Sequence, residues 1–208
     1  MDEVKRRGRP NVHSRDDLLE VTRTVAAERG YDGTRLTDVA EASGVPVSSL
    51  QHYFGTRDAM VREAVTAGVR DELARVQRAT RSIQDPWRRL QRMLRLAISS
   101  EDSDRRQGWL VWIEHWRGAL RDPELLADSA LVQREWRAMF AAVVQDGVDQ
   151  GVFHPVDSTD DITTELIALI DGLGIPLLLR RGDVTVVRAR RLVTRAAQRL
   201  LLPSPARG

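Results

Sequence analysis

The sequence of 208 residues predicts an all-α protein of about nine helices. Apolar residues recur at intervals of three and four, and helix start and stop signals alternate along the chain. No segment shows sustained alternation of apolar and polar residues, and no Asn-Gly or Asp-Gly hairpin lies between apolar runs. The apolar fraction of 42% and the charged fraction of 30% are typical of a folded globular protein.

The first three predicted helices are short and are separated by tight turns. Ser14 and Asp17 form an approximate capping box before the first helix, which ends at Gly30. The second helix spans about residues 36–43. The third lies within GVPVSSLQHYF, residues 44–54, and is marginal on its own because it has only about two turns.

The later helices are longer and more apolar. Their predicted start signals are Thr56, Asp85-Pro86, Asp122-Pro123, Ser158 and Asp183. The fourth helix runs roughly over residues 57–81. The helix that begins near residue 123 closes at two glycines and Pro155, and the last two span about 159–180 and 184–201.

The segment LTDVAEASGVPVSSL, residues 36–50, has the spacing of two helices that cross at a steep angle. Ala40 is small enough for close approach, Gly44 suits the turn, and Leu50 fills the space behind. This spacing is typical of a helix-turn-helix, whose second helix enters the major groove of DNA. An ordinary αα-corner, without any DNA-binding role, is the alternative.

The exposed face of the third helix is unusually polar. Its side chains are Val47, Ser48, Ser49, Gln51, His52 and Tyr53. They offer donors, acceptors and one apolar edge, which suits base edges and phosphates. Phe54, next to this face, is expected to be core.

The stretch GYDGTRLTDVAEASGVPVSSLQHYFGTRDAM resembles the DNA-binding domain of TetR-family transcriptional regulators, and the match covers about residues 14–62. The resemblance implies base-reading roles for Thr37, Val47, Ser48, Ser49 and His52. It implies phosphate contacts for Gln51, Tyr53 and Arg57. The family usually has tyrosine where Gln51 stands and very often lysine where Arg57 stands.

The amino-terminal segment contains the basic run KRRGRP. Residues 1–57 hold nine basic and nine acidic side chains, so the positive charge is local to this run. Arg6, Arg7 and Arg9 are expected to lie in a narrow minor groove or, alternatively, to act as a disordered basic tail. Either role would steepen the salt dependence of DNA binding.

Aromatic residues gather in the carboxyl-terminal part. Trp109, Trp112 and Trp116 share one helix face, and Trp136 and Phe140 lie on the next helix. Such stripes are usually core packing, but indole walls also suit a flat apolar ligand or a cation held over the rings. The candidate ligand-binding residues are Met93, Trp109, Trp112, His115, Trp116, Trp136, Met139, Phe140 and Leu166.

The segments WLVWIEHW and ALIDGL resemble the TetR subgroup that includes regulators of choline-betaine metabolism. The last two helices carry a broad apolar arc with the small residues Ala168, Gly172 and Gly174, and Pro176 should kink the first of them. The family resemblance implies that these helices form a homodimer through a four-helix interface. Burial within the monomer is the alternative.

Three segments follow from these observations: a basic arm, 1–13; a helix-turn-helix DNA-binding domain, 14–57; and a helical effector-binding and dimerisation domain, 58–208. The resemblance implies a ligand-responsive regulator, most simply a repressor, that binds a near-palindromic operator as a homodimer and is released by a small molecule. An activator or an effector-independent regulator is the alternative. A helical small-molecule-binding protein or an enzyme, without a DNA-binding role, is a further alternative.

An enzyme is not expected, because Glu114 and Asp171 are the only obvious carboxylates within mostly apolar helices and have no evident partners. Asp171 is interpreted as structural. The four histidines lack the spacing of a helical zinc site and there are no cysteines, so neither a metal nor another cofactor is expected beside the unidentified effector.

No secretory signal and no apolar run of ~20 residues occurs, so no membrane partner is expected. The chain is expected to be cytoplasmic, and associated with the nucleoid when bound to DNA.

Overall fold

The computed structural model describes residues 14–98, 102–180 and 182–202. These residues form nine helices and no strand, so the predicted all-α class is confirmed. The helices are α1 (Arg15–Arg29), α2 (Leu36–Ser43), α3 (Val47–Phe54), α4 (Arg57–Thr80), α5 (Pro86–Ala97), α6 (Asp102–Ala119), α7 (Pro123–Asp149), α8 (Thr159–Leu178) and α9 (Val186–Leu201).

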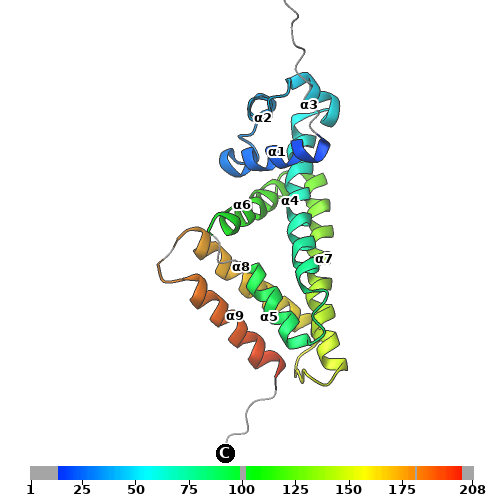
Figure 1. The fold of residues 1–208 in the computed structure, drawn as a ribbon, viewed down its shortest axis with the longest axis vertical. Coiled ribbons are helices and arrows are strands. Elements are labelled where there is room, and N and C mark those ends of the chain that lie inside the picture. Colours follow the sequence, from blue (N-terminus) through cyan, green and yellow to red (C-terminus); the bar gives the residue numbers. More distant parts are fainter. Residues whose placement is uncertain (1–13, 99–101, 181, 203–208) are drawn as a thin grey trace, which may run out of the picture.

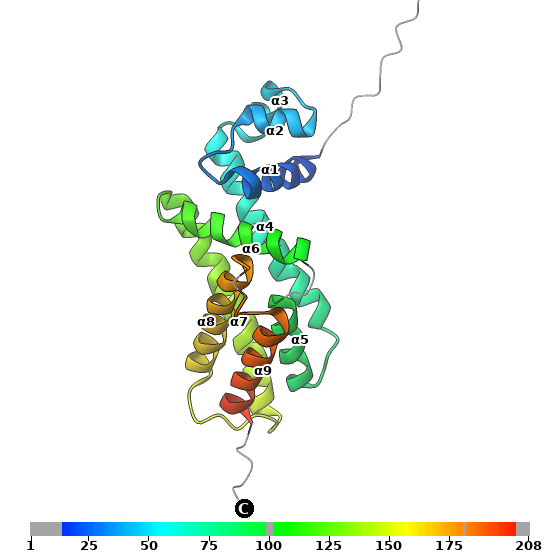
Figure 2. The same ribbon diagram turned by 90° about the vertical axis from the view of Figure 1, so that its left-hand side faces the viewer.

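The helices form an elongated molecule with α1, α2 and α3 at one end (Figure 1). The long helix α4 runs from that end along α7, and α5, α8 and α9 pack at the other end. Helix α6 lies between the two groups and contacts α1, α4, α7 and α8. Both termini of the described chain project from opposite ends (Figure 2).

Most predicted helix starts are confirmed by side-chain caps. Ser14 and Asp17 form a complete capping box, and Thr56, Asp85, Asp122 and Ser158 each accept a hydrogen bond from the first turn of their helix. The start predicted at Asp183 is wrong, because α9 is capped by Thr185, which accepts from the Arg188 N–H. Both residue types cap helices well, so sequence alone did not choose between them.

Two apolar cores meet along α4. The residues at its start, such as Met60 and Val65, pack with Val39, Leu50 and Phe54 of the amino-terminal helices. Val76, near its other end, belongs to the carboxyl-terminal core. Val39 and Leu50 are fully buried, as a helix-turn-helix requires, and the expectation that Phe54 is core is confirmed. A single rigid helix therefore joins the two parts.

The end of α6 is bonded to the loop that follows α1. The Glu114 carboxylate accepts hydrogen bonds from the backbone N–H of Tyr31, at 2.5 Å, and from the Arg117 guanidinium, at 2.9 Å. Arg117 also pairs with Asp32 at 2.6 Å, and Arg121 pairs with the same carboxylate at 2.9 Å. Glu114 therefore has partners that the sequence did not reveal, and they lie in the amino-terminal part.

Tyr31 fills the space beneath this junction. Its ring is buried, and a Cβ added to Gly118 would lie only 3.2 Å from it, so the glycine permits the contact. Its hydroxyl donates to Asp122 at 3.2 Å, and the Arg57 guanidinium lies 5.2 Å from the ring centre. Burial, followed by the nearby Asp122 charge, raises the pKa of Tyr31 to about 12.

Within the described ranges no helix combines the length and the apolar character that crossing a bilayer demands.

Replacing Glu114 with alanine tests the junction. Glu114→Ala would leave the Tyr31 N–H and the Arg117 guanidinium without their acceptor, so we expect the free energy of unfolding in urea to fall by ~1–3 kcal/mol. Glu124→Ala is the matched control, because Glu124 forms an exposed ion pair with Arg62 and its loss should cost below ~1 kcal/mol. Equal losses for the two variants would contradict a structural role for the Glu114 contact.

Candidate functional site

The first candidate site is the exposed face of α3, at the far end of the molecule (Figure 2). Ser48, Gln51 and His52 are exposed, and Tyr53 is 36% exposed. Val47 and Ser49 are half-buried, and Thr37 lies exposed on the neighbouring α2. The structure therefore brings the predicted base-reading positions to adjoining surfaces of α2 and α3.

Helix α3 is held in place from behind. Leu50 and Phe54 are its buried anchors, and Gly44 adopts a left-handed backbone, with φ of 70°, in the turn that precedes it. Arg15 makes contacts to this helix that the sequence did not predict. Its guanidinium donates to the Tyr53 carbonyl, pairs with Glu63 and lies 4.6 Å from the Phe54 ring centre. A short helix thus keeps a fixed orientation while its other face stays free.

Arg57 differs from the other predicted DNA contacts. Its Nε donates to the Thr34 carbonyl at 2.7 Å, its Nη1 pairs with Asp58 at 2.6 Å, and its Nη2 is buried without a partner. The guanidinium is engaged inside the protein, where it orders the loop between α1 and α2. Arg6, Arg7 and Arg9 lie outside the described residues.

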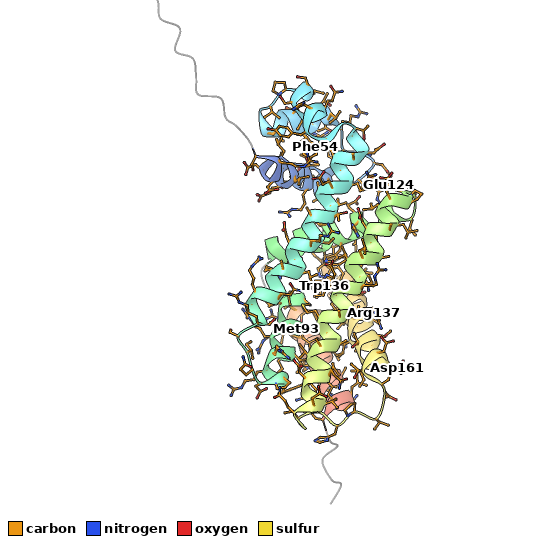
Figure 3. The ribbon with its side chains drawn as sticks, turned by 90° about the vertical axis from the view of Figure 1, so that its right-hand side faces the viewer. Phe54, Met93, Glu124, Trp136, Arg137 and Asp161 are labelled. Carbon is orange, nitrogen blue, oxygen red and sulfur yellow. The ribbon has the colours of Figure 1, made fainter. Side chains whose placement is uncertain are left out.

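The second candidate site is a cavity of about 400 Å³ among α4, α6, α7 and α8. Its aromatic walls are Trp109, Trp112, Trp116, Trp136 and Phe140. The rings form one connected cluster, in which the Trp112 centroid lies 5.5 Å from that of Trp116 and 5.9 Å from that of Trp136. Figure 3 shows Trp136 at mid-height in the molecule, beside α4 and α7. The structure thus brings together five of the predicted ligand-binding residues.

A glycine fixes the position of the first tryptophan. A Cβ added to Gly174 on α8 would lie 1.8 Å from the Trp109 ring, so only glycine allows the indole to pack here. Trp109 is in turn 8% exposed and belongs to the carboxyl-terminal core. This wall of the cavity is therefore firmly packed.

Asp171 is the unexpected member of the site. It lines the cavity from α8, and none of the described residues gives it a hydrogen bond or an ion pair. Burial raises the pKa of its carboxyl group to about 6, so the group is mostly ionised at pH 7. The Trp136 Nε1–H is also buried without a partner. The interpretation of Asp171 as structural, made from sequence, stays a prediction.

The charged residues at the rim balance one another. Arg23, on α1, pairs with Asp71 at 2.9 Å, and Arg75 pairs with Glu72 at 2.5 Å. These four residues line the cavity with Glu20 and Arg78. Two charged pairs of the lining are thus internally compensated, whereas the negative charge of Asp171 has no ion pair with a described residue.

Four predicted ligand-binding residues do not line the cavity. Met93 and Leu166 are fully buried in the carboxyl-terminal core, and Met139 packs against that core. His115 is fully buried at the α4–α6–α7 contact, with no partner for either ring nitrogen. Burial lowers the pKa of His115 to about 4, so it is neutral at pH 7.

Other lining residues were missed by the sequence. They include Gly68, Leu96, Ala97, Gly108, Val111, Gln133, Ile167, Ile170 and Asp171. The one available signal was the presence of a carboxylate, Asp171, in the strongly apolar α8. The described ranges contain no group of three or more histidine, aspartate or glutamate side chains that could hold a metal.

Comparison with known proteins bears on both sites. Residues 18–64 match the model of bacterial regulatory proteins of the tetR family, and residues 86–202 match that of the BetI-type transcriptional repressor carboxyl-terminal domain. The second match alone covers more than half of the chain.

Similar proteins of known name are bacterial regulators. The HTH-type transcriptional repressor KstR2 of Mycolicibacterium smegmatis is 27% identical over 141 residues, which cover 68% of each chain. The HTH-type transcriptional regulator BetI of Burkholderia cenocepacia is 25% identical over 182 residues, covering 86% of this chain and 89% of BetI.

A similar fold is present in the crystal structure of a transcriptional regulator from Saccharomonospora viridis, in complex with choline. It is 26% identical, with a TM-score of 0.82, and the match covers 91% of this chain and 98% of that one. A helix-turn-helix with a free polar face and a BetI-type helical domain occur here in one chain. The chain therefore belongs to the TetR family of transcriptional regulators and is not an enzyme.

Proposed function

We propose that this regulator is a homodimeric repressor that leaves its operator when an organic cation of the quaternary ammonium class binds in the aromatic cavity. The observation that carries the proposal is the unpaired Asp171 carboxylate in a cavity walled by tryptophans.

The indole rings and the Asp171 carboxylate would both stabilise a bound cation. The faces of indole rings attract a cation within ~6 Å, by up to ~2 kcal/mol when the ion is desolvated. A buried carboxylate without a partner is costly, and an opposite charge beside it relieves that cost. A quaternary ammonium donates no hydrogen bond, so it can lie against the indole faces without leaving a donor unpaired.

The comparisons support this ligand class. The Saccharomonospora viridis regulator, with a TM-score of 0.82, was solved with choline bound. The family model that matches residues 86–202 is that of a BetI-type repressor. The proposal requires no cofactor beside the effector.

Helix α6 provides a route from the cavity to the DNA-binding end. It carries Trp112 and Trp116 on the cavity side and Glu114 and Arg117 at the junction with the loop after α1. A cation that displaces the indoles would move the same helix that holds Tyr31. A ligand that prefers one position of α6 shifts the population of the DNA-binding arrangement.

Operator binding requires two copies of α3 at a fixed spacing. The apolar stripe proposed for this pairing consists of Leu169 and Ile175 on α8, Leu179 directly after α8 and Leu192 on α9, which are 36–66% exposed. Figure 2 shows α8 and α9 side by side on one face. Patches of this kind commonly mark subunit interfaces. Bound to its operator, the dimer would reside at the nucleoid.

Disrupting the stripe tests the dimer. Ile175→Glu places a charge in the proposed interface, so we expect the protein to elute as a monomer in size-exclusion chromatography with light scattering, and to lose affinity for a near-palindromic operator. Val156→Glu is the control, because Val156 is 99% exposed in the connection before α8. A folded Ile175→Glu variant that remains dimeric would place the interface elsewhere.

Replacing His52 tests the DNA-binding face. His52→Ala should reduce the preference for operator over random duplex DNA by roughly five- to a hundredfold, because a good base contact is worth ~1–3 kcal/mol. The matched control is His154→Ala, since His154 is also exposed but lies after α7. Fluorescence anisotropy over a salt series measures both preferences. An unchanged preference in His52→Ala would remove His52 from the base-reading set.

Replacing Asp171 with asparagine tests the cation site through stability. The folded-state pKa is raised to about 6, so the folded protein binds an extra proton between about pH 4 and 6, and the ionised carboxylate destabilises it above pH 6. Asp171→Asn should therefore raise the free energy of unfolding at pH 7.5 by roughly 1–2 kcal/mol, and the difference should vanish near pH 4.

The same variant should bind choline at least tenfold more weakly by titration calorimetry. In the wild-type protein choline affinity should fall as the pH drops below 6, because Asp171 becomes neutral. Glu165→Gln, on an exposed position of the same helix, is the control for both measurements. Equal binding of choline and of its uncharged isostere 3,3-dimethylbutanol would refute a cation site.

A further inference from the structure

We call the tryptophans and Asp171 the cation cage. The cavity is larger than this cage requires to hold a quaternary ammonium group. Its volume of about 400 Å³ falls in the range of ~300–1,000 Å³ that holds drug-sized ligands. The aromatic and acidic groups around Trp112, Trp116 and Asp171 occupy only part of its lining. The rest of the cavity lining indicates which other chemical groups the effector contains.

A second part of the cavity lining consists of apolar side chains. We define the aliphatic lobe as the lining contributed by Leu96, Ala97, Phe140, Ile167 and Ile170. Leu96 and Ala97 come from the end of α5, which packs against α4, α7 and α9. The Arg75 guanidinium, which also lines the cavity, donates to the Leu96 carbonyl at 3.4 Å and borders this lobe.

The aromatic and acidic part of the cavity and the aliphatic lobe follow one another along α7 and α8. Phe140 lies four residues after Trp136 on α7, and Ile167 lies four residues before Asp171 on α8, an offset of ~6 Å in each helix. Helix α7 runs away from the DNA-binding end and α8 runs back toward it (Figure 1). Phe140 and Ile167 therefore both lie on the side of the cage that is farther from α3.

We infer that the effector is an amphiphilic cation: a quaternary ammonium head held by the tryptophans and Asp171, joined to an unbranched apolar chain that fills the aliphatic lobe. This inference rests on the proposed function and specifies the ligand class of the same site. Choline would occupy the cage and leave the lobe empty. Arg23 and Arg75 each pair with a carboxylate of the lining, so the proposed chain carries no second charged group.

A homologous ligand series tests the inference. The probes are tetramethylammonium and the butyl-, hexyl- and octyl-trimethylammonium ions, below their micellar concentrations. Each methylene that enters an apolar lobe should raise affinity about three- to fourfold until the lobe is full. Titration calorimetry on the full chain measures the affinities, and the concentrations that release operator DNA should follow the same order.

Two variants locate the chain. Ile167→Phe narrows the aliphatic lobe, so hexyltrimethylammonium should bind no better than tetramethylammonium. Ile167→Met keeps the volume and should keep the chain-length dependence. Thermal unfolding curves establish that both variants are folded, and if Ile167→Phe is not, the wild-type series decides the question alone.

The outcomes separate the two proposals. A wild-type series that is flat within twofold, with tetramethylammonium bound, would overturn the amphiphile and leave the cation site standing. Failure of every cation in the series to bind would overturn the proposed function itself. A chain-length dependence that survives in folded Ile167→Phe would place the chain outside the aliphatic lobe and overturn the inference.

Discussion

The hydrogen bond from the Tyr31 backbone N–H to Glu114 is the contact on which the coupling between the two parts depends. It fixes α6 to the loop after α1 through a partly buried, charge-assisted interaction, which is stronger than a neutral one. The same helix presents Trp112 and Trp116 to the cavity. Helix α6 therefore contacts both the cavity and the loop that joins the DNA-binding helices.

Close packing at glycines leaves α6 little freedom. A Cβ added to Gly68 would lie 2.9 Å from Val111, one added to Gly174 would lie 1.8 Å from Trp109, and one added to Gly118 would lie 3.2 Å from Tyr31. At these three points the helix is in direct contact with α4, α8 and the loop after α1. Packed contacts of this kind pass a displacement on rather than absorb it.

Local signals predicted much of this fold, and long-range chemistry explains what they missed. Caps and glycines lie within a few residues of the helix ends that they define, so most boundaries were accessible from sequence. The Glu114 partner is 83 residues away in the chain, and the missing partner of Asp171 is a property of the assembled core. Leu166 was chosen in place of its neighbour Ile167, because an apolar helix does not reveal which of two adjacent residues faces a cavity and which faces the core.

The unpaired carboxylate of Asp171 also bears on how long the protein persists. Any ligand that binds only the folded state stabilises it by mass action, and a cation beside Asp171 removes a destabilising charge as well. Proteases degrade chains that open, so the effector-bound repressor would outlast the same protein free of both effector and operator. A cell that consumes its effector would then restore repression from an existing pool, without waiting for new synthesis.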